Sequence, residues 1–210
     1  AEMREMLSVL QEAYEHPVET EFTANFSADG RHHVNLVQCR PLQVRTAGAG
    51  RKAVGAPPPD SVVLLEARGA VVGQDREERV DRVVYVVPAG YGRLPVGDRY
   101  AVARLLGKGM HAHGAGEPPR TLVVGPGRWA TTTPSVGIPV AFSEIGTAAF
   151  ICEIVAMPEG LVPDVSLGTH FFNELIELDM LYFALFPGKE GNRLDDSPLL
   201  SAPNRLAGLV

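Results

Sequence analysis

Residues 18–26 read VETEFTANF and residues 33–40 read HVNLVQCR, and in the first run apolar and polar side chains nearly alternate. A period of two is typical of a β-strand that packs one face against a core. Phe22 and Phe26 fall on the same face, so we expect a half-buried strand. The residues between the runs, 27–31, include the Asp-Gly pair of a tight turn. The sequence therefore predicts an antiparallel β-hairpin.

The other face of this hairpin carries charged and amide groups. A register with Glu21 opposite Gln38 also places Glu19 opposite Arg40, and a slip by one residue would scatter the four. Carboxylates are hard ligands for magnesium, and a guanidinium grips phosphate oxygens with paired hydrogen bonds. The alternative is a solvated cross-strand ion pair of the ordinary surface kind, which contributes little stability.

The order of helix, proline, acidic strand, turn and then LVQCRP at residues 36–41 resembles the end of the nucleotide-binding domain of phosphoenolpyruvate synthases and pyruvate phosphate dikinases. The resemblance implies an ATP-grasp fold in which Glu21 binds Mg²⁺, while Gln38 and Arg40 hold the transferred phosphoryl group of ATP. Glu19 stands where the family often has Asp, so the resemblance also implies a second metal contact there. The hairpin of this chain is longer than that of the family.

Composition limits the classes of function. The chain has 210 residues, 45% of them hydrophobic, and a net charge of −6, which suits a packed core and argues against a nucleic-acid surface. No apolar run approaches the length of a membrane span. Cys39 and Cys152 are too few for a disulfide framework or a structural zinc site, so we expect a reducing cytoplasm.

The pattern of elements predicts a mixed α/β protein in several parts. Residues 1–45 are expected to form a helix over 1–16 and the hairpin, which the resemblance implies is the end of an ATP-grasp-like domain. The glycine- and proline-rich segment 46–60 is expected to be a linker, 61–190 an α/β domain and 191–210 a tail. We expect strands at 62–66, 83–87, 121–124, 150–155 and 181–185, and helices at 98–111 and 169–178.

Two segments of the second domain could bind an anion. In VGPGRWATTT at 124–133, Gly125 and Gly127 let the backbone approach a ligand, and Arg128 with the threonines could hold it. The equally weighted alternative is a tight turn in which Trp129 is buried and Arg128 pairs with a carboxylate. No Gly-Lys-Ser/Thr follows, so this is no Walker loop.

The other segment is PDVSLGTHFFN at 163–173, where Ser166 or Thr169 could cap a helix whose free N–H groups favour an anion. His170 is expected to hydrogen-bond locally at the helix start. A catalytic triad of Asp164, Ser166 and His170 is disfavoured, because the glycine-flanked elbow of a serine nucleophile is absent.

Together these two segments resemble an extra domain that follows the nucleotide-binding domain in some bacterial dikinase relatives, over residues 60–188. That family usually has glycine at the position of Ala130. No established activity comes with this resemblance, so the sites of this domain are inferred from their chemistry alone.

The leading hypothesis is a fragment of an ATP-dependent phosphotransferase that supplies part of a Mg-ATP site. Neither a lysine-bearing nucleotide lobe, a phosphohistidine motif nor a barrel for pyruvate or phosphoenolpyruvate can be found in the sequence, so we expect no turnover by this chain alone. The alternative is a non-catalytic anion- or nucleotide-sensing or assembly domain. Apolar faces left exposed could also drive formation of a homodimer.

Overall fold

The chain forms two compact units, Ala1–Val44 and Arg45–Val210, and each is described by itself. The computed structural model describes residues 2–15, 18–41, 55, 57–73, 76–113, 117–157, 160–166 and 170–208. Both helices and sheets are present, in agreement with the predicted mixed α/β class. Most of the expected linker, 46–60, lies outside the described residues.

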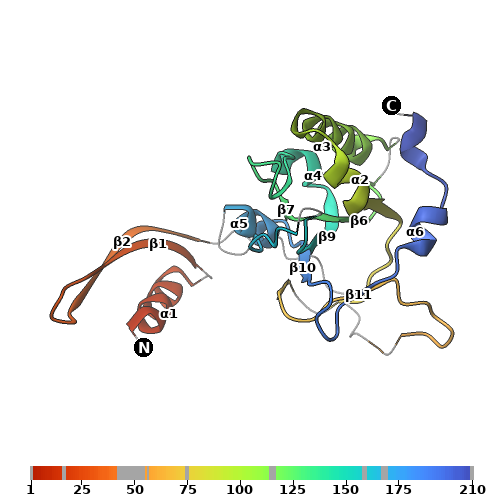
Figure 1. The fold of residues 1–210 in the computed structure, drawn as a ribbon. Coiled ribbons are helices and arrows are strands. Elements are labelled where there is room, and N and C mark those ends of the chain that lie inside the picture. Colours follow the sequence, from red (N-terminus) through yellow and green to blue (C-terminus); the bar gives the residue numbers. More distant parts are fainter. Residues whose placement is uncertain are drawn as a thin grey trace. The chain divides into compact units, whose positions relative to one another are not determined.

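The first unit consists of a helix and a two-stranded hairpin, α1 (Glu2–Tyr14), β1 (Val18–Phe26) and β2 (His32–Pro41) (Figure 1). The predicted helix is confirmed, and it packs against β1 as expected. Its partly buried side chains include Met6 and Leu10, which recur at helical spacing, whereas Val9 between them is 59% exposed. The helix therefore covers its neighbour with one narrow apolar stripe.

The predicted register of the hairpin is confirmed, because Glu19 pairs with Arg40 and Glu21 with Gln38. The register then shifts, so that Phe22 pairs with Leu36 and Val37 is left as the extra residue of a β-bulge. The shift puts Leu36 on the face of Phe22 and leaves Gln38 on the opposite face. The bulge thus adds one residue to β2 without disturbing the polar pairs.

The prediction of a half-buried strand is correct only for the first three residues of β1. Val18, Glu19 and Thr20 are partly buried, and every later residue of the strand is exposed. Phe22 is 46% and Phe26 79% exposed. No described element of the first unit covers the outer half of the hairpin, because α1 is shorter than the hairpin and β1 is partly buried only over its first three residues.

The second unit is built on a five-stranded sheet of order β4-β10-β9-β6-β5. Its four parallel strands are adjacent in the order of the chain, and the short β4 adds an antiparallel edge. Right-handed crossovers that always advance in one direction leave all the connecting helices on one face. The strands are β4 (Val71–Val72), β5 (Arg82–Tyr85), β6 (Thr121–Pro126), β9 (Ala148–Ile154) and β10 (Leu181–Leu185).

The two faces of this sheet support two separate cores, since side chains alternate along each strand. The larger core lies under the helices and contains Ile151 and Tyr182 of the sheet with Leu106, Ile145 and Leu175 of the helices. The connecting helices are α2 (Pro88–Arg93), α3 (Val96–His111), α4 (Phe142–Ile145) and α5 (His170–Glu177). The predicted helices at 98–111 and 169–178 are confirmed as α3 and α5, with slightly different bounds.

The smaller core covers the other face with short elements from both ends of the unit. Leu65 of β3 (Leu65–Glu66) and Leu194 of β11 (Arg193–Leu194) pack on Val124 and Leu185, and the two strands pair antiparallel. Tyr85 Oη donates a hydrogen bond of 2.9 Å to Asp196. The segment expected as a tail is therefore joined to the sheet. It also contains α6 (Ser197–Ser201) and a 3₁₀ turn at Arg205–Gly208.

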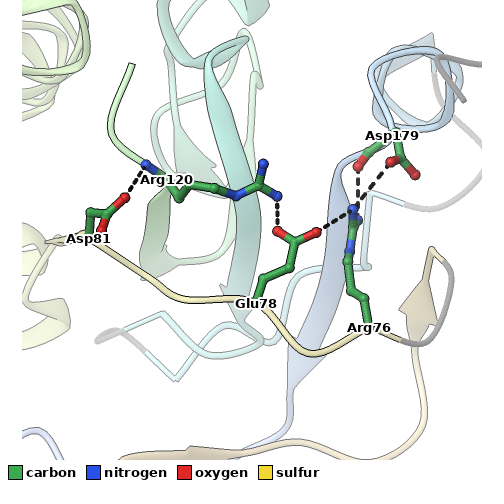
Figure 2. Close-up of polar contacts among 5 residues, drawn as sticks. All are labelled: Arg76, Glu78, Asp81, Arg120 and Asp179. Atoms are coloured by element: carbon green, nitrogen blue, oxygen red, sulfur yellow. Dashed lines mark hydrogen bonds and ion pairs between the residues drawn. The ribbon is translucent and has the colours of Figure 1, made fainter. Parts of the chain in front are cut away.

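A network of ion pairs closes the amino ends of the parallel strands (Figure 2). Figure 2 shows the Glu78 carboxylate between the guanidinium groups of Arg120, which precedes β6, and Arg76. Arg76 Nη1 lies 3.3 Å from Asp179 Oδ2, and Nη2 donates to the Asp179 carbonyl at 2.8 Å, just before β10. The Arg76 side chain is 2% exposed. We assign this network a structural role, because it joins strand starts and lies away from their carboxyl ends.

None of the described helices is long and apolar enough to cross a membrane.

Candidate functional site

The hairpin brings together the four side chains predicted to hold magnesium and phosphate. Arg40 Nη2 donates to both oxygens of Glu19, at 3.2 and 3.0 Å, and Arg40 Nε donates to Oε2 at 3.2 Å. The Glu19 side chain is 14% exposed and that of Arg40 50% exposed. Glu21 and Gln38 are exposed beside this pair. The structure therefore contains the cross-strand ion pair of the first alternative. It also places the four polar residues on one face, as the metal and phosphate interpretation requires.

The carboxylates of this face fit magnesium only with help from a ligand. Among the described residues, no group of three or more His, Cys, Asp and Glu side chains could hold a metal ion. Magnesium in nucleotide sites is commonly held by one or two carboxylates together with phosphate oxygens and water. Glu19 and Glu21 lie two residues apart on one face and could provide these carboxylates.

A second candidate site lies where β6 and β9 end in the other unit. After β6 the chain turns at Gly127, whose φ is +66°, and enters β7 (Arg128–Trp129). β7 pairs in parallel with β8 (Gly137–Ile138), and a side chain at Gly137 would overlap the Arg128 backbone. Gly127 and Gly137 therefore allow β7 and β8 to pack closely against each other beyond the end of β6.

Glu153 of β9 is the buried centre of this site. Its side chain is 1% exposed, yet it accepts hydrogen bonds from the backbone N–H groups of Trp129 at 3.0 Å and Ser166 at 3.1 Å. It also accepts a short hydrogen bond from Ser166 Oγ and one of 2.5 Å from Tyr182 Oη. Four donors satisfy the carboxylate. Glu153 thus fastens the two predicted anion-binding segments to the sheet.

The neighbours of Glu153 are buried with their protons retained. Burial first, and the Glu153 charge second, raise the pKa of Tyr182. Burial likewise raises the pKa of the Cys152 thiol, with Glu153 as the second cause. The Cys152 carbonyl accepts a hydrogen bond of 3.0 Å from the Trp129 indole. Tyr182 is therefore a donor to the carboxylate and Cys152 an unreactive thiol.

A pocket of about 350 Å³ opens above this layer. Arg128 and Ser166 both line it, so the structure brings the two segments together. Trp129 is 1% exposed, as the tight-turn interpretation predicted. The paired carboxylate that this interpretation gave to Arg128 is not found within the described part of the chain. The polar lining consists of Arg128, Thr131, Thr132, Thr133 and Ser166.

Buried groups of α2 and α3 hold the outer loop of this pocket. Arg99 is 3% exposed, donates to the Pro134 carbonyl at 2.9 Å, and lies 5.2 Å from the centre of the Tyr91 ring. Tyr91 Oη donates to the Gly137 carbonyl at 2.7 Å. These bonds satisfy the carbonyl groups of Pro134, in the loop, and of Gly137, in β8.

Four other predicted residues have different outcomes. A side chain at Gly125 would meet the Trp129 ring at 2.9 Å, and one at Gly127 would overlap the Val136 carbonyl. Both glycines therefore permit packing of protein on protein, in place of the ligand approach expected from the sequence. Thr169 lies outside the described residues. His170 begins α5, but its side chain is not described.

Three important residues were missed by reasoning from the sequence, namely Glu153, Tyr182 and Arg99. A detectable signal existed for Glu153, because it is the single charge in the apolar run FICEIV at residues 150–155. A carboxylate inside a buried strand requires partners. No such signal marks Arg99, which lies in the helical pattern among other charged residues.

No protein-family model, curated protein or solved structure matches this chain.

Proposed function

We propose that the polar face of the β1–β2 hairpin supplies metal and phosphate contacts in an ATP-dependent phosphotransferase of the dikinase type. The observation that carries the proposal is the register, which places Glu19 opposite Arg40 and Glu21 opposite Gln38. The motif resemblance concerns the same residues. The bulge lies beyond these pairs and leaves them intact.

Each side chain has a distinct role in this proposal. Glu21 and Glu19 would hold Mg²⁺, which would neutralise part of the negative charge on the phosphates of ATP. Gln38 positions the phosphoryl group through its amide, and Arg40 stabilises negative charge as that group transfers. Arg40 uses Nε and Nη2 for Glu19, so Nη1 is oriented by the ion pair and makes no bond to another described residue.

The other parts of such an enzyme would come from outside these 210 residues. In the proposal they bind the nucleotide base and the acceptor, which in this family is pyruvate or phosphate, with phosphoenolpyruvate as the product. The chain alone would bind Mg-ATP weakly and would not turn over. Free Cys39 and buried Cys152 fit a reducing cytoplasm as the site of action.

Calorimetric titration of the chain with Mg-ATP tests the proposal. We expect weak binding, in the millimolar range, that requires magnesium and is lost in Arg40→Ala. Arg31→Ala is the matched control, because Arg31 lies on the same hairpin and pairs with Asp29 at the turn. The proposal fails if Arg40→Ala binds Mg-ATP as the unaltered chain does.

A further inference from the structure

The pocket above Glu153 has the location of a ligand site. It lies at the carboxyl ends of β6 and β9, and in open parallel sheets ligands bind outside these ends. Its volume of about 350 Å³ falls in the range of small-molecule sites. The hairpin proposal does not use this pocket, so the two stand or fall separately.

The charge of the pocket favours an anion. Arg128 is the one charged residue among the described residues that line it, and its guanidinium makes no hydrogen bond or ion pair to another described residue. The nearby Glu153 carboxylate is 1% exposed and is satisfied by its own donors. Threonine hydroxyls beside Arg128 add neutral donors. A planar guanidinium with hydroxyls around it suits a carboxylate or a phosphate.

An adjoining pocket extends the site with an apolar surface. It has a volume of about 540 Å³ and shares Ala130, Thr131, Thr132 and Phe171 with the first pocket. Its remaining lining is mostly apolar and includes Pro139, Val140 and Phe142, where Phe142 packs edge-on against Phe171 with ring centres 5.5 Å apart. This volume is larger than a bare anion requires.

Glu174 sets the polarity of the combined site. It is the acidic residue among the described residues that line the adjoining pocket, so it disfavours a second negative group there. The cation and the carboxylate lie at different parts of the joined pockets, since Arg128 lines only the first and Glu174 only the second. A ligand would therefore carry its negative charge at one end.

We propose that the joined pockets bind a small metabolite that carries one anionic group, a carboxylate or a phosphate, on an apolar body. The anionic group lies against Arg128 and the threonines, and the body lies against Phe142 and Phe171. The site is formed in advance, because Glu153 and Arg99 hold its two walls through buried hydrogen bonds. Little ordering is then required on binding.

Trp129 provides a direct readout, since it is the only tryptophan and lines the pocket. The experiment follows its fluorescence while the chain is titrated with four probes. Phenyl phosphate and phenylacetate carry an anion on an apolar body, inorganic phosphate has the anion alone, and benzyl alcohol has the body alone. The first two probes distinguish a phosphate ligand from a carboxylate ligand.

We expect phenyl phosphate or phenylacetate to bind at least about tenfold more tightly than inorganic phosphate or benzyl alcohol. Equal binding of benzyl alcohol and the anionic probes would overturn the role of the charge. Equal binding of inorganic phosphate and phenyl phosphate would overturn the claim that an apolar body contributes to binding. No binding of any probe at millimolar concentrations would overturn the site.

Arg128→Ala should lower the affinity for the anionic probes by about tenfold or more, and Arg128→Lys should recover part of that loss. Arg104→Ala is the matched control, because it removes the same charge from an exposed position of α3 outside both pockets. Unchanged binding in Arg128→Ala contradicts the proposal. If that variant does not fold, Thr132→Val replaces it and should weaken the anions selectively.

Discussion

Ala130 adopts a backbone conformation that suits glycine. Its φ is +53°, in the left-handed region, and it directly follows β7, where the chain leaves the β7–β8 pair. A Cβ in this region contacts the following carbonyl oxygen, which glycine avoids. A glycine at this position would remove that contact.

Ala130→Gly should raise the free energy of unfolding by up to about 1 kcal/mol, because relief of the left-handed strain exceeds the entropic cost of glycine. The same change at exposed Ala101, inside α3, should lower it by about 1 kcal/mol. Urea denaturation followed by Trp129 fluorescence measures both. A loss of stability in both variants would mean that Ala130 is not strained.

Glu153 should be one of the most sensitive positions. Glu153→Gln keeps the shape but turns one acceptor oxygen into a donor that faces an existing donor, such as the Trp129 N–H or Tyr182 Oη. We expect a loss of about 2–4 kcal/mol in the free energy of unfolding. Glu117→Gln, at an exposed position, is the control and should change little. Equal stability of the two variants would contradict the assignment.

At the scale of elements, the hairpin contains a β-bulge that no sequence motif predicts. Alternation alone extends the pairing of Glu21 with Gln38 to a pairing of Phe22 with Val37. The structure instead omits Val37 and pairs Phe22 with Leu36. Both registers keep the polar pairs, but only the bulge keeps Leu36 on the apolar face. Alternation therefore predicts the part of a hairpin before a bulge and fails after it.

Deletion of Val37 should leave the polar face unchanged, because Gln38 would then follow Leu36 directly and both existing pairs would remain in a regular ladder. Cross-strand nuclear Overhauser effects between residues 21 and 38, and between 22 and 36, are expected in the unaltered chain and in the deletion variant. The Gly30 turn is unaffected and serves as an internal reference. Cross-strand contacts that pair residue 23, and not residue 22, with residue 36 in the unaltered chain would exclude the bulge.

The longer elements could be predicted from the sequence, whereas the short ones could not. Strands β6, β9 and β10 are apolar runs, and α3 has a clear helical period, so local pattern identifies them. β4, β7, β8 and β11 have two residues each, too few for any period. They exist because other elements pair with them, which is information that a local window lacks.

For the whole molecule, the sequence placed the two segments predicted to bind an anion in one domain but could not show what joins them. Arg128 and Ser166 are 38 positions apart, and the Glu153 carboxylate, from a third segment, joins the backbone N–H groups of Trp129 and Ser166. That Glu153 joins these two segments follows from the folded structure and cannot be read from local sequence. The register of the hairpin was predictable because its residues lie on neighbouring strands joined by one turn.

Several buried phenols and a thiol together determine the alkaline stability of the second unit. Burial raises the pKa of Tyr91 to about 12, and it raises the pKa values of Tyr85, Tyr182 and Cys152 as well. These groups ionise earlier in the unfolded chain, where the thiol has its ordinary pKa of 9.0 and the phenols 10.0. Above pH 9 the folded state therefore binds more protons than the unfolded state.

The free energy of unfolding should hence stay level from neutral pH to about pH 9 and then fall, by up to about 1.4 kcal/mol per pH unit for each group. Urea midpoints across this range measure the fall. Tyr91→Phe should lower stability at neutral pH, through the lost bond to Gly137, but should flatten the curve between pH 10 and 12. A level curve up to pH 11 would contradict this account.

The central claim is that the hairpin face binds the metal and phosphates of a nucleotide. Paramagnetic broadening by Mn-ATP tests it most directly, since Mn²⁺ occupies magnesium sites and broadens the amide signals around it. The account predicts selective broadening at residues 19–21 and 38–40, which disappears in Arg40→Ala. Broadening only around residues 128–133, or none at the hairpin at millimolar Mn-ATP, would contradict it.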